Sequence, residues 1–285
     1  MTVDREALQR QIDALAQEEN GTRIVRLQQV RELATTNECS IRDVELAALE
    51  MSVVPWRYVR NLGTVGLEGQ IKLLQATVAV VGLGGLGGYV VEALARMGVG
   101  RLILIDGDVF EEHNFNRQVL SSEAKMGMNK VQVARQRVAE INGAVGVTGH
   151  AVVLTRENLP QLLEGADVVV DALDRLPIRL ILQEGAQALD IPMVHGSIAG
   201  FLGQVMTIFP GDPGLIGLYG GQSDLPEQGL EAQLGIPAAT PMAVAAWEIH
   251  EVTKILVDRG ELLRHRLLVM DMEAGTMEVL QLGTR

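Results

Sequence analysis

Residues 77–97 read TVAVVGLGGLGGYVVEALARM, and this stretch decides the fold of the chain. A β-branched run typical of a buried strand leads into a glycine-rich turn, which opens a helical pattern. Gly82, Gly84 and Gly87 form the spacing G-x-G-x-x-G in that turn. Glycines there let backbone N–H groups approach a phosphate, and the helix start adds partial positive charge. The stretch therefore predicts a nucleotide-binding turn, although a tight strand-to-helix turn without a ligand would use the same glycines.

Short apolar runs continue to alternate with helical patterns along the chain from residue 77 to residue 196. Continuous apolar strands between amphipathic helices are typical of a parallel sheet covered on both faces. Beyond residue 196 come three strand-like runs, at 204–210, 266–271 and 276–282, and one long helical pattern at 243–260. We therefore predict an α/β fold with a Rossmann-like, mostly parallel sheet and an antiparallel C-terminal extension.

Residues 1–52 are charged, poor in glycine and helical in pattern, including the run TRIVRLQQVRELA. They predict a small helical N-terminal extension, and residues 53–285 predict one nucleotide-binding domain. SIRD, from Ser40 to Asp43, fits a capping box that opens a helix. The glycine- and proline-rich segment 211–241 predicts a long loop, which at this length is usually functional or mobile.

Composition narrows the classes of function. With 285 residues, of which 47% are apolar, the chain can bury a sizeable core, and its net charge of -12 disfavours nucleic acid or an anionic membrane as a partner. The single cysteine, Cys39, excludes an internal disulfide and a paired-cysteine zinc site. The first residues show no apolar signal segment, so we expect a cytoplasmic protein without a membrane span.

A cluster of polar residues follows the glycine turn. Asp106 ends the next strand, where an acid accepts hydrogen bonds from ribose hydroxyls, and Asp108, Asn114, Arg117 and Lys130 come after it. Hydride transfer by a nicotinamide needs no cations there, whereas attack on an α-phosphate builds negative charge that Arg and Lys can stabilise. The cluster favours ATP over NAD, although either cation alone is also consistent with a solvated surface charge.

Six segments carry a resemblance to a known family: RYVRNLGTVGLEGQIKL, VVGLGGLGG, DGDVFEEHNFNRQ, GMNK, DALDRLPIR and HGSIAGFLGQVMTIFPGDPG. Over roughly residues 56–285 the chain resembles the MoeB/ThiF/HesA family, the prokaryotic relatives of ubiquitin-activating enzymes. The resemblance implies an adenylyltransferase that uses ATP and Mg²⁺. Its implied substrate is the C-terminal Gly-Gly carboxylate of a ubiquitin-like sulfur-carrier protein of the MoaD or ThiS type, activated for molybdopterin, thiamine or related biosynthesis.

The resemblance also implies site residues. Asp174 would be the catalytic aspartate that holds Mg²⁺, Arg175 replaces a frequent asparagine, and Arg179 matches a family arginine. Arg60 would reach into the site of a partner subunit, which implies a homodimer, although a surface arginine on a linker is the simpler alternative. The implied catalytic residues are Arg60, Arg117, Lys130 and Asp174. The implied nucleotide-binding residues are Gly82, Gly84, Gly85, Gly87, Asp106, Asp108, Asn114, Arg117, Lys130, Asp174 and Arg175.

The chain departs from the family pattern because it lacks the two CxxC pairs of many relatives. We therefore expect no zinc, and no thioester or acyl persulfide on the enzyme itself, so that the adenylate is released or passed to a separate sulfur donor. Cys39 is expected to be a small loop residue. Two further residues remain ambiguous: Asp171 is interpreted as a cap of the next helix, and His195 as a core or supporting residue.

Three other functions stay open at this point. Adenylation of a carboxylate on a tRNA nucleoside would use the same chemistry, but it conflicts with the acidic net charge. An NAD-dependent oxidoreductase would leave Arg117, Lys130 and the HNFNRQ loop without a role. A non-catalytic module that only holds a carrier protein would leave the nucleotide motifs unexplained.

Overall fold

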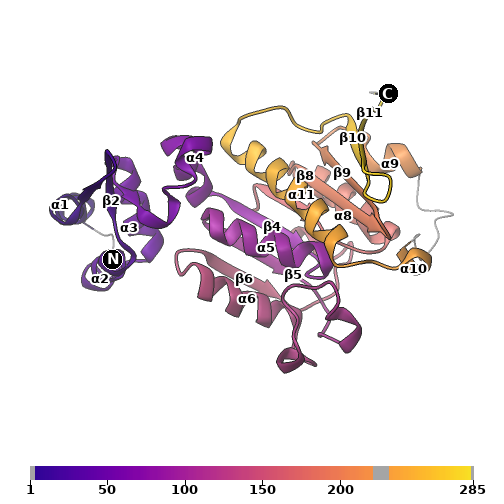
Figure 1. Ribbon diagram of the computed structural model, residues 1–285, viewed down its shortest axis with the longest axis horizontal. Coiled ribbons are helices and arrows are strands. Elements are labelled where there is room, and N and C mark those ends of the chain that lie inside the picture. Colours follow the sequence, from indigo (N-terminus) through magenta and orange to yellow (C-terminus); the bar gives the residue numbers. More distant parts are fainter. Residues whose placement is uncertain (1–3, 221–230, 284–285) are drawn as a thin grey trace.

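The central feature of the protein is an eight-stranded sheet with the strand order β11-β10-β9-β8-β7-β4-β5-β6, seen in a computed structural model that describes residues 4–220 and 231–283 (Figure 1). The five strands from β8 to β6 are parallel, and β9, β10 and β11 add in antiparallel fashion after β8. The strands are β4 (Thr77–Val81), β5 (Arg101–Ile105), β6 (Gly146–His150), β7 (Val168–Asp171), β8 (Met193–Ala199), β9 (Leu202–Ile208), β10 (Arg266–Asp271) and β11 (Thr276–Gln281). The predicted fold class is confirmed.

Helices cover both faces of the sheet, which explains why the central strands are apolar throughout. Val78 and Val80 of β4 belong to one core cluster, and the alternating Ala79 and Val81 belong to another. The first cluster is formed with α4 (Leu62–Gln75), α5 (Gly85–Met97), α6 (Lys130–Ile141) and α11 (Ala239–Val257). The second is formed with α7 (Leu159–Leu162), α8 (Leu176–Ala188) and α9 (Gly214–Tyr219).

The N-terminal extension has its own small core and contains strands as well as helices. Its helices are α1 (Arg5–Leu15), α2 (Leu27–Thr36) and α3 (Ile41–Glu50), and its three-stranded sheet consists of β1 (Gln17–Glu19), β2 (Thr22–Val25) and β3 (Val54–Pro55). The predicted capping box at Ser40 is confirmed. The predicted helices are present, but Thr22–Val25, at the start of the run TRIVRLQQVRELA, form strand β2 rather than helix. Asn20 and Gly21, both at positive φ, form a hairpin turn there, which ends the helical pattern.

The extension contacts the sheet domain at the end where β5 begins. The guanidinium of Arg42 donates to the carbonyl of Gly100, 3.2 Å away. The Tyr58 hydroxyl donates to the carboxylate of Glu45 and accepts from the amide of Asn142. These contacts lie opposite the carboxyl ends of the parallel strands. The division into domains at residue 52 stays a prediction, and β3, just beyond it, pairs with β2.

The segment 211–241 was predicted as one long loop, and this is wrong for part of it. Helix α9 and the short helix α10 (Glu231–Leu234) lie within it, and α11 begins at Ala239. Residues 221–230, in the middle of the segment, lie outside the described residues. Among the helices described for residues 4–220 and 231–283, none combines the length and apolarity that a membrane span requires.

Candidate active site

A cavity opens at the carboxyl ends of β4, β5 and β7. The chain passes from β4 to β5 on one side of β4 and later returns to form β7 on the other side, and such a switch of direction is where open α/β sheets bind ligands. Polar and glycine residues around the cavity are Gly82, Gly84, Gly85, Asp106, Gly107, Asp108, Arg117, Gln118, Lys130, Asp174, Arg175 and Arg179. Val152, Val153, Ile178, Ile198 and Ile236 contribute apolar walls.

The glycines of the turn, Gly82, Gly84, Gly85 and Gly87, serve two different purposes. Gly82 has φ +89°, and a Cβ there would lie 2.5 Å from the carbonyl oxygen of Ala172. At Gly87 a Cβ would lie 1.8 Å from the carbonyl oxygen of Gly82, so these two glycines allow the turn and helix to pack. A Cβ built on Gly84 or on Gly85 would lie 3.6 Å or 3.5 Å from its nearest neighbouring atom, which is an ordinary contact distance. Their absent side chains leave space inside the cavity, and Gly87 does not line it.

Asp106 holds the glycine turn in place. Its Oδ2 accepts a hydrogen bond from the backbone N–H of Leu83 at 2.7 Å, and its Oδ1 accepts one from the N–H of Asp108 at 2.8 Å. Burial raises the pKa of Asp106, while the nearby charge of Lys130 lowers it. Because each carboxylate oxygen has a second lone pair, the predicted contact with a ribose hydroxyl is compatible with these bonds.

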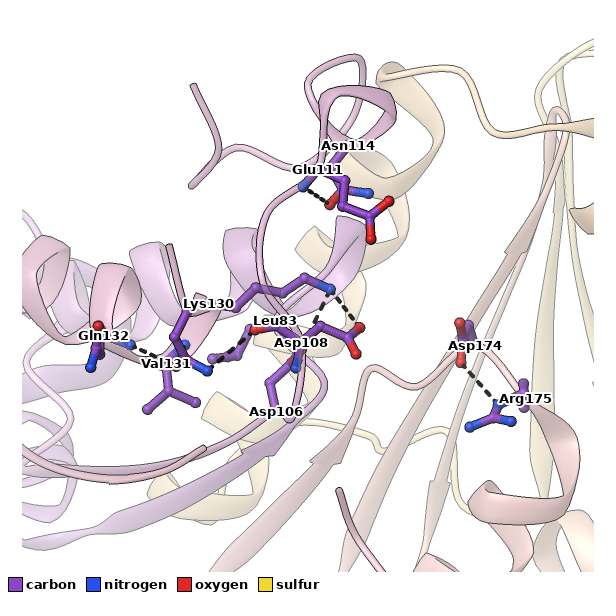
Figure 2. A network of polar contacts seen from close by, with 11 residues as sticks. Leu83, Asp106, Asp108, Glu111, Asn114, Lys130, Val131, Gln132, Asp174 and Arg175 are labelled. Carbon is purple, nitrogen blue, oxygen red and sulfur yellow. Dashed lines mark hydrogen bonds and ion pairs between the residues drawn. The ribbon is translucent and has the colours of Figure 1, made fainter. Parts of the chain in front are cut away.

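Lys130 presents a buried ammonium to the cavity from the start of α6. Its Nζ lies 2.9 Å from Oδ2 of Asp108 and 3.9 Å from Oδ2 of Asp106, and Figure 2 shows the amine turned toward Asp108. Only 7% of the Lys130 side chain is exposed. The two carboxylates offset the cost of burying this charge. The structure thus brings Asp106, Asp108 and Lys130 together at the cavity.

Arg117 and Asp174 face the same cavity from different loops. The Arg117 guanidinium donates to the carbonyl of His113 at 2.8 Å and to the side chain of Asn116 at 2.9 Å. Burial lowers the pKa of Arg117, and the charge of Asp174 acts in the opposite direction. Asp174 and its neighbour Arg175 lie on the turn after β7, apart from the Lys130–Asp108 pair, and the Asp174 side chain is 84% exposed (Figure 2).

Besides Gly87, the predicted site residues Asn114 and Arg60 are not among those that line the cavity. The buried Asn114 accepts a hydrogen bond from the backbone N–H of Glu111 and thereby caps the short 3₁₀ helix Glu112–Asn114. Arg60 is exposed, and the side chain of the adjacent Asn61 contacts the carbonyl of Met97 at the far end of α5. Because α5 has 13 residues, Met97 is about 18 Å from the glycine turn. Arg60 therefore lies outside the cavity of its own chain.

Gln118 lines the cavity but was not singled out from the sequence. It is 6% exposed, its amide nitrogen lies near Gly84, and its amide oxygen has no hydrogen-bond partner among the described residues. An unsatisfied buried acceptor at this place is suited to a donor on a ligand. Its position at the end of the HNFNRQ motif was the one available signal.

Asp171 and His195 form a buried pair beneath the cavity. His195 Nδ1 lies 2.7 Å from Oδ2 of Asp171, and Oδ1 of Asp171 accepts from the backbone N–H of Leu173 at 3.1 Å. The interpretation of Asp171 as a helix cap was wrong, since α8 begins only at Leu176. His195 is 2% exposed, and burial lowers its pKa, which agrees with a supporting role.

The side chains around the cavity fit ATP with Mg²⁺. Gly84 and Gly85 leave room for phosphates, and Lys130 and Arg117 supply positive charge beside that room. In the described part of the chain, no group of three or more His, Cys, Asp or Glu side chains could hold a metal ion. Mg²⁺ in nucleotide sites is usually held by one or two carboxylates together with substrate phosphates, which the exposed carboxylate of Asp174 suits.

Comparisons with known proteins agree with this geometry. Residues 58–285 match the model of the ThiF family. The chain is 36% identical over 233 residues to the SAMP-activating enzyme E1 of Haloferax volcanii, covering 80% of this chain and 85% of that protein. It is 33% identical over 232 residues to the adenylyltransferase and sulfurtransferase MOCS3 of Drosophila yakuba, covering 80% of this chain but only 51% of that relative, about half its length.

Among solved structures, the chain resembles Escherichia coli MccB. Its complex with ATP matches with a TM-score of 0.67 at 22% identity, covering 89% of this chain and 82% of MccB. The complex with AMPCPP and MccA matches with a TM-score of 0.69 at 20% identity, covering 90% and 83%. At these identities the likeness concerns the fold.

Proposed function

The chain belongs to the ThiF family and is an adenylyltransferase, and we propose that it activates the C-terminal Gly-Gly carboxylate of a ubiquitin-like sulfur-carrier protein. In this proposal ATP is the adenylyl donor, Mg²⁺ accompanies it, and the product is an acyl-adenylate. The adenylate then receives sulfur from a separate donor, for molybdopterin, thiamine or a related compound.

One observation carries the proposal: the space left by Gly84 and Gly85 opens beside the cations Lys130 and Arg117 and the carboxylate Asp174 in one cavity. A triphosphate needs both features, since backbone N–H groups bind its oxygens and cations offset its charge. A narrow peptide end without side chains suits the remaining space. A module that only held a carrier protein would have no use for this arrangement.

The reaction follows from the charges around the cavity. A carboxylate oxygen of the carrier attacks the α-phosphorus of ATP, the bond from that phosphorus to the bridging oxygen breaks, and pyrophosphate leaves with the electron pair. Lys130 and Arg117 stabilise the negative charge that develops on the phosphate oxygens. When bound, Mg²⁺ would be held by Asp174 and would offset further phosphate charge.

We further propose that the protein acts as a homodimer in which Arg60 completes the site of the partner subunit. Arg60 is exposed, and its neighbour Asn61 contacts the end of α5 opposite the glycine turn, so Arg60 would contribute to the site of a second copy rather than to its own. Closed two-fold dimers exchange contacts in this reciprocal way.

The test of the function is ATP–pyrophosphate exchange. Labelled pyrophosphate is incubated with the protein, ATP, Mg²⁺ and each purified candidate carrier, either intact or lacking its last glycine. We expect exchange with one intact carrier, none with its shortened form, and none with the Asp174→Ala protein. If no Gly-Gly carrier from the same organism supports exchange, the proposed substrate is wrong.

A further inference from the structure

A second group of ionisable side chains is buried under the floor of the cavity. Asp171 of β7 and Glu248 of α11 are 0% exposed, His195 of β8 is 2% exposed, and Arg179 of α8 is 7% exposed. Of these four residues, only Arg179 lines the cavity, and the sequence motifs gave Asp171, His195 and Glu248 no part in nucleotide binding. Their chemistry therefore needs a separate account.

Arg179 holds the backbone on both sides of the cavity floor. Its Nη1 donates to the carbonyl of Gly196 at 3.0 Å, and its Nη2 donates to the carbonyl of Leu173, the residue before Asp174. The same guanidinium lies 3.4 Å from Nδ1 of His195. Because these bonds come from a cation in a buried place, they are strong, and they fix the turn that carries Asp174.

Glu248 packs directly against this arrangement. A Cβ built on Gly196 would lie 2.4 Å from Cδ of Glu248, so the carboxyl group occupies the space that any larger residue at 196 would need. Neither carboxyl oxygen of Glu248 has a hydrogen-bond partner, and the carboxyl forms no ion pair, within residues 4–220 and 231–283. The group is thus completely buried and unpaired.

The charges nearby decide the protonation state of Glu248. Asp171 and Arg179 already balance one another, so a second carboxylate would add an uncompensated negative charge to a fully buried site. Burial and the charge of Asp171 raise the pKa of Glu248 well above the usual range, and Arg179 opposes this only in part. Burial without a hydrogen-bond partner and the charge of Asp171 thus both favour the uncharged form of Glu248.

Ionisable groups on the other elements that pack against α11 are engaged elsewhere: on α5, Glu92 pairs with Arg96 and Arg137. Lys72 of α4 donates to the carbonyl of Val257 at the far end of α11. On α11 itself, Glu251 accepts from Thr207 of β9 and from the N–H of Leu263, and it pairs with Lys254. Asp171 and Arg179 are the charged groups that act on Glu248, whereas the side chain of His195 lies on the opposite face of β8 from the contact between Gly196 and Glu248.

Building on the adenylation reaction proposed above, we propose that Glu248 is a positioning residue: its uncharged carboxyl fills the space against Gly196 and leaves Arg179 to hold the turn before Asp174. When Glu248 loses its proton at alkaline pH, the new negative charge draws the guanidinium away from the carbonyl of Leu173. The turn then loosens, and Asp174 is no longer held in place.

The first readout is amide hydrogen exchange at Leu173, Asp174 and Arg175, which needs neither nucleotide nor carrier. At neutral pH we expect exchange about tenfold faster in Glu248→Ala than in the native protein, and rescue by Glu248→Gln, which is uncharged and of the same shape. Exchange of unprotected amides itself becomes faster as pH rises, so the measured rates are divided by that intrinsic rate. After this correction, alkaline pH should accelerate exchange in the native protein and in the control Glu251→Gln, but not in Glu248→Gln. The proposal is overturned if the exchange rate of Glu248→Ala equals that of the native protein. It is also overturned if alkaline pH accelerates exchange in Glu248→Gln as much as in the native protein.

The second readout is the pH profile of ATP–pyrophosphate exchange. We expect the native protein and Glu251→Gln to lose activity at alkaline pH and Glu248→Gln to keep it. If activity falls at the same alkaline pH in all three proteins, Glu248 is not coupled to Asp174. Because hydrogen exchange is measured without substrate, its result stands even if no carrier is adenylated. Infrared spectroscopy at neutral pH tests the protonation state of Glu248. We expect a band of a protonated carboxyl group in the native protein that is missing from Glu248→Gln. Identical spectra of the two proteins would contradict the uncharged state.

Discussion

Mixing two inactive variants tests whether Arg60 acts across a subunit interface. Arg60→Ala removes the guanidinium that would enter the partner's cavity, and Asp174→Asn removes the carboxylate from the cavity of its own chain. Each variant alone is expected to lose at least about 10²-fold in ATP–pyrophosphate exchange, the usual cost of one charged group at a reacting phosphate. In a heterodimer the Arg60→Ala chain keeps Asp174 and receives Arg60 from its partner, so one of two sites is complete.

The magnitude follows from counting subunits. When equal amounts of the two variants exchange freely, half of the dimers are heterodimers with one complete site each, so the mixture should recover about a quarter of native activity. The exposed Arg31 of the N-terminal extension provides the control, since Arg31→Ala should retain native activity. A mixture no more active than its components, or an Arg60→Ala protein with native activity, would refute the reasoning.

Further predictions concern single residues. Lys130→Ala should lower exchange about 10²- to 10³-fold by removing the buried ammonium, and a rate within about threefold of native would contradict its role. Gly87→Ala should lower the Tm by several degrees in calorimetry, because its Cβ would lie 1.8 Å from a carbonyl oxygen, whereas Gly85→Ala should keep the Tm and weaken ATP binding. The raised pKa of Glu248 means that folding takes up a proton. Its contribution to the free energy of unfolding is complete below the pKa of glutamate in the unfolded chain and is lost as pH rises through the pKa in the folded protein. In urea titrations at several pH values, the free energy of unfolding should fall by at most about 1.4 kcal/mol per pH unit from this group, and Glu248→Gln should abolish that fall.

The fold was predictable where local requirements and burial agree. The stretch TVAVVGLGGLGG needs a strand buried on both faces, followed by a turn whose glycines allow close backbone approach, and both needs are visible in residue types. The order of motifs placed Asp106, Asp108 and Lys130 at one edge because the carboxyl ends of parallel strands meet there. The hairpin at Asn20 and Gly21 was missed because its strands are short and charged, although the Asn-Gly pair is itself a turn signal.

Other features depend on packing that no local pattern contains. Glu248 lies in a predicted helix, but its burial against Gly196 follows from how α11 crosses β8. The capping bond of Asn114 follows from the turn of the chain at Glu111, which its residue type alone does not reveal. The distance of Arg60 from its own cavity likewise follows from the placement of α4 beside the far end of α5.

The most direct measurement follows an oxygen atom from carrier to nucleotide. A carrier with ¹⁸O at both oxygens of its C-terminal carboxylate is incubated with the protein, ATP and Mg²⁺, and hydroxylamine captures the acyl group and releases AMP. If the carboxylate attacks the α-phosphorus, mass spectrometry will find one ¹⁸O atom in each AMP formed. AMP without the label, or turnover of ATP to ADP and phosphate, would contradict the adenylation of a carrier carboxylate.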